Sequence, residues 1–151
     1  MPFKLPEPIL LALAEAEAAG KRGEVPVGCV IANRAGAIIA ATGNRTLADH
    51  DPTAHAEVLA IREAARKLGS ERLTDCDLYV TLEPCAMCAA AISFARIGRL
   101  YFGAADEKMG AVENGPRFFQ QLTCHHRPEI YGGIGAEPAR ALLIQFFRDR
   151  R

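Results

Sequence analysis

One stretch of the chain, residues 77–104, constrains the fold more than any other. The segment "DLYVTL" is a short apolar run typical of a buried strand, "PCAMCAAAISFARI" has the small residues of a packed helix that begins at Pro84, and "RLYFGA" predicts another strand. Strand and helix therefore alternate along this stretch. Such alternation is typical of domains in which helices cover a central sheet.

The segments on either side extend this pattern. A helix capped by Gly20, a hairpin around the turn "NRAG" and a helix that ends before Gly69 are predicted ahead of residue 77. The predicted elements are helix 9–20, strands 25–32 and 37–42, helix 53–68, strand 77–82, helix 84–97, strand 99–104, a loop over 106–115, a short helical piece at 116–122, an edge strand at 129–133 and helix 137–151. We predict one α/β domain over residues 1–151, a three-layer α/β/α fold around a mixed, roughly five-stranded sheet.

Composition narrows the class of protein. The chain has 151 residues, half of them apolar, as expected for a single globular domain. The 18 Lys and Arg balance 18 Asp and Glu, so the strongly basic character of many nucleic-acid-binding proteins is missing, although the chain ends in "FFRDRR". The apolar run "ILLALA" is soon followed by Glu15 and Glu17, which suits neither a signal peptide nor a membrane span. We expect a cytoplasmic protein.

The five cysteines fit reduced thiols or metal ligands better than disulfides, because their number is odd and no export signal accompanies them. Cys85 and Cys88 are three residues apart on a predicted helix, so both sulfurs face the same side. The positive end of the helix dipole favours the thiolate that a metal needs. A lone C-x-x-C also occurs in redox proteins, so a further ligand is needed to decide.

His55 is that ligand in our interpretation. Catalytic zinc sites commonly have three protein ligands and a fourth position for water. Glu57, in the same predicted helical turn, can act as a general base on that water without binding the metal. Either residue alone is more readily a helix cap or a solvated side chain. Together "HAE" and "PCAMC", separated by residues 58–83, match the H-x-E … P-C-x-x-C signature of zinc nucleobase deaminases.

Longer blocks around these motifs resemble the bacterial tRNA-specific adenosine deaminases of the cytidine deaminase superfamily. The blocks are "EVPVG" (24–28), "GNRT" (43–46), "DPTAHAE" (51–57), "LYVTLEPCAMC" (78–88), "ARIGRLYFGA" (95–104) and the terminal "FFRDRR". The zinc motifs indicate only the superfamily, whereas the flanking blocks point to the tRNA enzymes. The resemblance implies a cytidine-deaminase-like fold, one Zn²⁺ per chain and a homodimer.

The resemblance also implies the reaction, which is hydrolytic deamination of adenosine to inosine at the wobble position of a tRNA anticodon, typically in an arginine tRNA. Zinc-bound hydroxide attacks C6 of the flipped-out adenine in such a reaction, and Glu57 moves the protons. Further residues are implied to contact the substrate in the pocket or along the C-terminal helix. They are Asn44, Val27, Asp106, Phe147, Arg148, Arg150 and Arg151.

Plainer interpretations stand beside these contacts. Asn44 follows a glycine and suits a turn, Val27 suits the core, and Asp106 suits a solvated loop. The chain end suits an aromatic core residue, which we expect of Phe146, followed by solvated charges.

The remaining cysteines and histidines predict no second metal site. The run "CHH" at 124–126 resembles a cluster, but adjacent residues rarely point at one ion. Cys29 and Cys76 are most simply small buried apolar residues.

Two other functions stay open. An enzyme of the same superfamily acting on free guanine, cytosine or cytidine would keep the zinc motifs, and so would a non-catalytic zinc module that binds RNA. The zero net charge weakens the case for an RNA substrate, because phosphate contacts dominate non-specific nucleic-acid binding. Removal of "FFRDRR" should abolish action on tRNA but need not prevent a reaction on a small molecule. Glu57→Ala should keep zinc and the fold but remove turnover if the protein is an enzyme of this kind.

Overall fold

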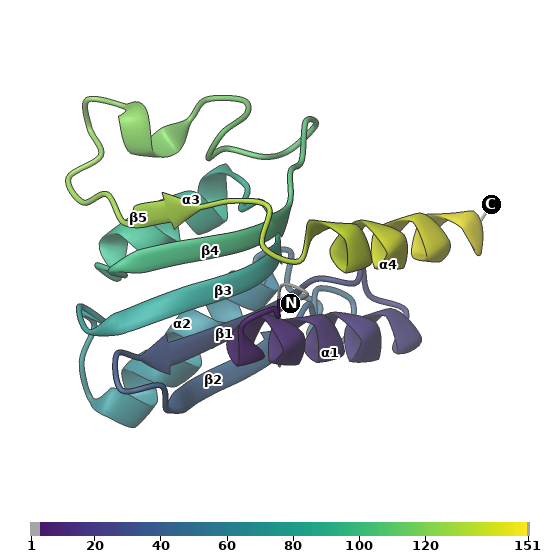
Figure 1. Ribbon diagram of the computed structural model, residues 1–151, viewed down its shortest axis with the longest axis horizontal. Helices are drawn as coiled ribbons and strands as arrows, with labels where there is room; N and C mark the ends of the chain where they lie inside the picture. Colours follow the sequence, from purple (N-terminus) through teal and green to yellow (C-terminus); the bar gives the residue numbers. More distant parts are fainter. Residues whose placement is uncertain (1–3, 151) are drawn as a thin grey trace.

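A five-stranded mixed sheet forms the centre of the molecule (Figure 1). The computed structural model describes residues 4–150, so the predicted contact Arg151 lies outside the described residues. Strand order is β2-β1-β3-β4-β5. Strand β1 (Gly28–Asn33) is antiparallel to both β2 (Ile38–Gly43) and β3 (Cys76–Leu82), whereas β4 (Arg99–Ala104) and β5 (Glu129–Tyr131) run parallel to β3. The predicted mixed sheet is confirmed.

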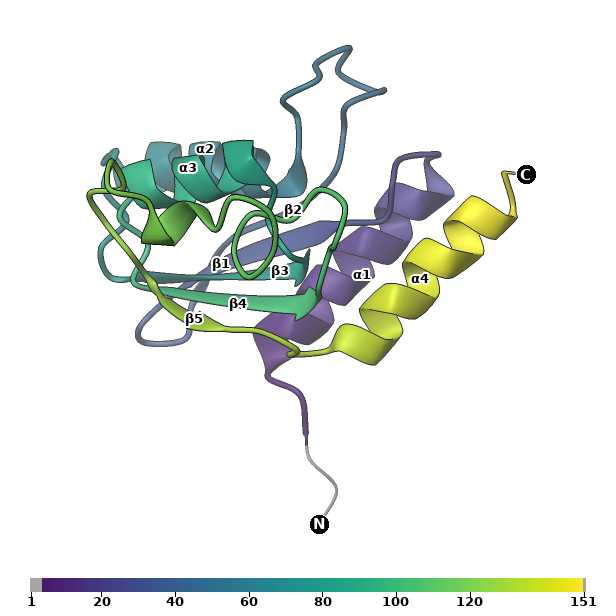
Figure 2. The same ribbon diagram turned by 90° about the horizontal axis from the view of Figure 1, so that it is seen from above.

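Helices cover both faces of this sheet (Figure 2). On one face α1 (Glu7–Lys21) packs over β1, β2 and β3, and α4 (Ala136–Arg148) packs beside it over β3 and β4. On the other face lie α2 (Ala56–Leu68) and α3 (Ala86–Phe94), which touch one another. This is the predicted three-layer α/β/α arrangement.

The N-terminal helix ends later than predicted. Gly20 is predicted as its cap, but α1 continues to Lys21, and the N–H of Arg22 still bonds to the carbonyls of Ala18 and Ala19. The residue that takes up a positive φ is Gly23, at 91°. Within residues 4–150 no helix has the length and hydropathy that crossing a membrane requires.

The third helix begins later than predicted. Pro84 is predicted at its first position, but α3 starts at Ala86 with Cys85 as the N-cap residue. The carbonyl of Pro84 accepts a hydrogen bond from the N–H of Ala111, which holds this part of the chain extended. The helical piece predicted at 116–122 is reduced to a 3-10 turn, η1 (Phe118–Gln120).

The core lies between the sheet and the layer of α2 and α3. Alternate residues of β3 and β4 are buried there, namely Leu78, Val80, Leu100 and Phe102, and they pack against small side chains of the two helices. On the opposite face α1 approaches β1 so closely that a Cβ on Gly28 would overlap the carbonyl oxygen of Ala12. This packing places the N-termini of α2 and α3 together near the C-terminal end of β3.

Candidate active site

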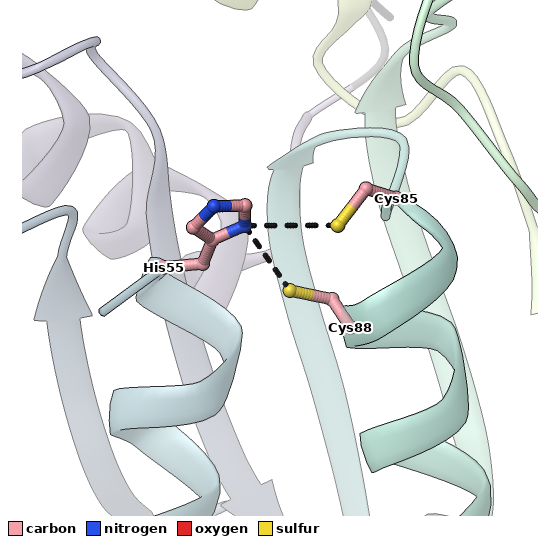
Figure 3. A group of neighbouring side chains, drawn as sticks. All are labelled: His55, Cys85 and Cys88. Carbon is pink, nitrogen blue, oxygen red and sulfur yellow. Dashed lines mark hydrogen bonds between the residues drawn. The ribbon is translucent and has the colours of Figure 1, made fainter. Parts of the chain in front are cut away.

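The three predicted metal ligands meet where α2 and α3 begin (Figure 3). His55 is the N-cap residue of α2, Cys85 is the N-cap residue of α3, and Cys88 lies in the first turn of α3. Their side chains point toward one another from the two helices. In the described part of the chain, no other group of three or more His, Cys, Asp or Glu is arranged to hold a metal.

The spacing of the ligand atoms fits a zinc ion. Nδ1 of His55 lies 3.7 Å from Sγ of Cys85 and 3.5 Å from Sγ of Cys88, and the three atoms lie within 4.8 Å of one another. Tetrahedral coordination, with Zn–S of about 2.3 Å and Zn–N of about 2.0 Å, requires N···S separations of about 3.5 Å. Three protein ligands leave a fourth position for water or substrate, as in catalytic zinc sites.

The two thiols are held so that one of them ionises easily. A hydrogen bond with Cys88 lowers the pKa of Cys85 to about 4, and His55 contributes to the decrease. The same contact with Cys85, together with burial, raises the pKa of the Cys88 thiol. The contact with Cys85 also raises the pKa of His55. A thiolate beside an imidazole at a helix N-terminus is a ready ligand for a divalent cation.

Glu57 lies in the first turn of α2 and is only 4% exposed. Burial raises the pKa of its carboxyl to about 7, and the negative charge at Cys85 adds to this rise. A carboxyl that titrates near neutral pH can both accept and return a proton. Glu57 borders the same pocket as His55 and Cys85, which supports the predicted general-base role.

A pocket of about 230 Å³ opens beside these groups, and His55, Glu57 and Cys85 form its floor. Pockets for drug-sized ligands are commonly about 300–1,000 Å³, so this one suits a single small ring system. The other lining residues are Val25, Val27, Asn44, Thr46, Leu82, Glu83, Asp106 and Met109. The structure thus brings the predicted Val27, Asn44 and Asp106 together around the zinc ligands.

Asn44 is fixed by the backbone on both sides of its amide. Its Oδ1 accepts a hydrogen bond from the N–H of Ala56 (2.8 Å), and its Nδ2 donates to the carbonyl of Val25 (3.2 Å). Because Ala56 is the first residue of α2, Asn44 ties the start of this helix to the pocket wall. An amide has two N–H donors and two acceptor lone pairs, so one of each is left for a ligand. The contact with a base therefore stays a prediction.

The other two predicted pocket residues have structural contacts as well. Val27 is 6% exposed and belongs to the hydrophobic core as well as to the pocket wall. Oδ1 of Asp106 accepts hydrogen bonds from the N–H groups of Lys108 (3.0 Å) and Met109 (3.1 Å), which shapes the loop after β4. Both residues are thus placed for substrate contact while contributing to the fold.

Five pocket residues were missed in the sequence. Val25 is 37% exposed and Met109 is 68% exposed, whereas Glu83 is 2% exposed; Thr46 and Leu82 border the same cavity. All except Met109 lie inside a quoted motif block, but no spacing rule distinguishes a pocket wall from an ordinary loop. Only Glu83 carries a visible signal, since a glutamate directly after an apolar strand is unusual inside a core.

The end of α4 lies beside the loop between α1 and β1 (Figure 2). A second hollow there, of about 260 Å³, has a lining that includes Lys21, Pro26, Phe146 and Arg150. Pro26 lies between Val25 and Val27, two residues that line the first pocket. Phe146 is buried as predicted, and the guanidinium of Arg150 lies 3.6 Å from its ring centroid.

The other predicted contacts on this helix face outward. Phe147 is 50% exposed, and Arg148 is exposed beside it. Their positions are compatible with contacts to a ligand larger than the pocket.

The run "CHH" at 124–126 has a structural explanation. The thiol of Cys124 donates to the carbonyl of His126 (3.2 Å), and Nε2 of His126 lies 2.7 Å from the carbonyl oxygen of Ile97. These contacts tie the segment before β5 to the start of β4. Cys29 and Cys76 are buried in the core.

Comparisons with known proteins agree with this site. The family model described as the cytidine and deoxycytidylate deaminase zinc-binding region matches residues 7–104, and the chain belongs to this family of zinc-dependent deaminases. Among curated proteins, the tRNA-specific adenosine deaminase of Agrobacterium fabrum is 59% identical over 141 residues, which cover 93% of this chain and 92% of that protein. Zinc is thus the cofactor of the family, as the ligand set predicts.

Solved structures extend the likeness to three dimensions. A structure from a study of A-to-I editing by tRNA:A34 deaminases at the wobble position of transfer RNA has a TM-score of 0.88 and 57% identity, covering 90% of this chain and 98% of that one. Guanine deaminase from Bacillus subtilis has a TM-score of 0.63 and 36% identity, covering 78% and 86%. The predicted fold and family are confirmed.

Proposed function

We propose that this chain is an enzyme that hydrolyses adenosine to inosine at the wobble position of a tRNA anticodon. The observation that carries the proposal is a pocket whose floor combines the ligand set His55, Cys85 and Cys88 with the buried carboxyl of Glu57. A zinc site that only stabilised a fold would need four protein ligands and no such carboxyl. The choice of tRNA as substrate is supported by the 59% identity to a tRNA-specific adenosine deaminase over almost the whole chain.

The chain's own residues account for the proton transfers. Zinc, when held by His55, Cys85 and Cys88, lowers the pKa of water from 15.7 to roughly 7 and thereby supplies a nucleophile at neutral pH. Glu57, whose pKa is about 7, takes the proton of the attacking water and delivers it to ring N1 as C6 becomes tetrahedral. The same carboxyl then moves the proton of the new C6 hydroxyl to the exocyclic amine. The C–N bond breaks, and inosine and ammonia are the products.

The pocket walls supply binding. An adenine must leave its stack to reach the floor, so the walls close around one base while the neighbouring nucleotides meet the rim. Val27 packs against the base, and the free donor and lone pair of Asn44 face the purine edge. Asp106 borders the nucleotide from the other side of the pocket.

The end of α4 provides a second contact area for the anticodon loop. Phe147, which is half-exposed, stacks on an unpaired base, and Arg148, Arg150 and Arg151 contact phosphates. This local cluster of positive charge compensates for the zero net charge of the whole chain. An arginine tRNA is the expected substrate, as the family resemblance implies.

The active form is a homodimer in this proposal, and the whole chain is one deaminase domain. A hollow beside α2 and α3 is lined mainly by apolar side chains, including Phe94, which is 78% exposed, and also by the charged Arg62 and Glu71. An exposed aromatic side chain in a mainly apolar hollow with charged residues suits an interface between two copies. Light scattering tests this directly, and a monomer at micromolar concentration would refute it.

The deciding experiment uses an arginine tRNA transcript with adenosine at the wobble position. Inosine is read at that position by reverse transcription and sequencing, while free guanine, cytosine and cytidine are assayed for ammonia. We expect inosine at this single position, and a decrease in rate of about 10²–10⁴-fold for Glu57→Ala with zinc retained. Ammonia from guanine without inosine in tRNA would instead support a free-base deaminase, the activity of the B. subtilis relative.

A further inference from the structure

Two buried carboxylates outside the reaction chemistry anchor opposite walls of the pocket. Glu24 and Glu83 are each 2% exposed, and neither belongs to the zinc ligand set. A buried carboxylate is costly unless hydrogen bonds satisfy it. The partners of these two residues therefore indicate what they do.

Glu83 gathers the backbone of residues 106–114, which form one wall of the pocket. Its Oε1 accepts hydrogen bonds from the N–H of Asp106 (3.0 Å) and the side-chain amide of Asn114 (2.7 Å). Its Oε2 accepts from the N–H groups of Val112 (3.0 Å), Glu113 (2.9 Å) and Asn114 (3.0 Å). Because this wall contains no helix or strand, the carboxylate replaces the regular ladder that would otherwise satisfy these donors.

The packing around Glu83 leaves this wall little freedom. A Cβ added to Gly110 would lie 2.6 Å from Cδ of Glu83 and would overlap the carbonyl oxygen of Asp106. The backbone of Gly110 also forms a β-bridge with Cys85. This backbone bridge joins the wall to the segment of Cys85 without involving the carboxylate of Glu83.

Glu24 holds the opposite wall, residues 44–48. Its Oε1 accepts hydrogen bonds from Oγ1 of Thr46 (3.3 Å) and the N–H of Leu47 (3.2 Å), and its Oε2 accepts from the N–H of Ala48 (2.9 Å). With its backbone fixed in this way, Leu47 keeps its side chain 67% exposed.

From these contacts we infer that Glu24 and Glu83 are positioning residues that set the width of the substrate pocket. The inference rests on the proposed function, because it assigns the two walls to substrate binding. Glu83 places Asp106 and Met109, and Glu24 places Thr46, whereas the zinc ligands and Glu57 lie on helix termini that neither carboxylate contacts. Loss of either anchor therefore weakens substrate binding more than it slows the chemical step.

The test is steady-state kinetics of Glu83→Gln on the tRNA transcript, with the zinc content of each preparation measured. Glutamine keeps the shape, but its NH₂ group cannot accept, so either the Asp106 side or the 112–114 side of the wall loses its acceptor. Losing hydrogen bonds to a charged group predicts about a tenfold rise in KM, with kcat within about threefold of the wild type and one zinc per chain.

A second measurement is independent of activity. Hydrogen–deuterium exchange of residues 106–114 should be faster by about tenfold in Glu83→Gln, while exchange in α1 stays unchanged. Unchanged exchange in this wall, or unchanged KM, would overturn the inference. A parallel loss of kcat and of zinc would also overturn it, because it would mean that Glu83 merely supports the fold.

Matched variants complete the test. Glu83→Asp keeps two acceptor oxygens and should recover part of the loss in KM. Asn114→Ala removes only one hydrogen bond, so it should raise KM in the same direction by a smaller factor even if Glu83→Gln fails to fold. Glu137→Gln, at a side chain that is 93% exposed on α4, should behave as the wild type. A wild type that forms no inosine while its wall still loosens in Glu83→Gln would refute the proposed function but not the anchoring.

Discussion

The floor and the walls of the pocket are built in different ways. The floor uses the N-termini of α2 and α3, where His55, Cys85 and Cys88 converge within 4.8 Å. The walls are irregular segments that depend on two buried carboxylates and one asparagine for their shape. Groups that react need rigid helix ends, whereas a surface that fits a ligand can be built from loops if their backbone donors are satisfied.

This difference predicts how variants should behave. Loss of one zinc ligand in the floor should abolish activity, because three ligands share one ion. A change in a wall or at the end of α4 should weaken substrate binding only in part, because many weak contacts contribute to it. The following three experiments test the comparison in order of decreasing effect.

Cys88→Ala should eliminate the metal site in the floor of the pocket. Removal of one of three protein ligands leaves the ion with His55 and Cys85, so we expect loss of bound zinc and a decrease in kcat/KM of at least about 10³-fold. Thermal stability should also fall, because metal binding is coupled to folding. Metal analysis and calorimetry measure both effects, with chelator-treated wild type as the reference. A variant that still holds one zinc per chain would mean that the ligand set is wrong.

Arg148→Ala combined with Arg150→Ala should affect only the proposed RNA contact area at the end of α4. We expect the fold to be retained, because the buried side chain of Phe146 is kept and only its contact with Arg150 is lost. We expect KM for tRNA to rise by about 3–10-fold with kcat unchanged, and the salt dependence of binding to decrease by about one to two phosphate contacts. Arg140→Ala is the matched control, since Arg140 lies at the other end of α4 and pairs with Glu137 at 3.4 Å. An equal effect in the control would contradict the assignment of RNA contacts to the end of α4.

Glu24→Gln should reveal a small, pH-dependent contribution of the wall to stability. Burial opposes ionisation of Glu24, but hydrogen bonds from Ala48, Leu47 and Thr46, together with nearby Arg22, outweigh it and lower the pKa. A lowered pKa stabilises the fold above the unfolded value of about 4.3, and this contribution is lost as the pH falls through the folded pKa. At pH 7 the variant should be less stable by about 1–2 kcal/mol. The gap should narrow below pH 4 in denaturant titrations, and a constant gap would contradict the assignment.

Much of the fold was predictable because its elements have strong local patterns. The alternation over 77–104 predicts β3, α3 and β4, and the strand β4 has the predicted bounds. Helix ends were less accurate. Pro84 suits a first helical position, yet the hydrogen bond from Ala111, a residue distant in sequence, keeps it outside α3. Local preference was overridden by a tertiary contact.

The sequence by itself was enough to predict the chemistry, because zinc ligands and a general base have few possible residue types and a distinctive spacing. It could not determine the shape of the pocket. Glu24, Glu83 and Val25 belong to the site only because the fold brings together loops that lie far apart along the chain. Asn44 likewise acquired its hydrogen bonds to Ala56 and Val25 only in three dimensions. Hydrogen bonds between distant segments leave no periodic pattern in the sequence, so tertiary structure alone decides them.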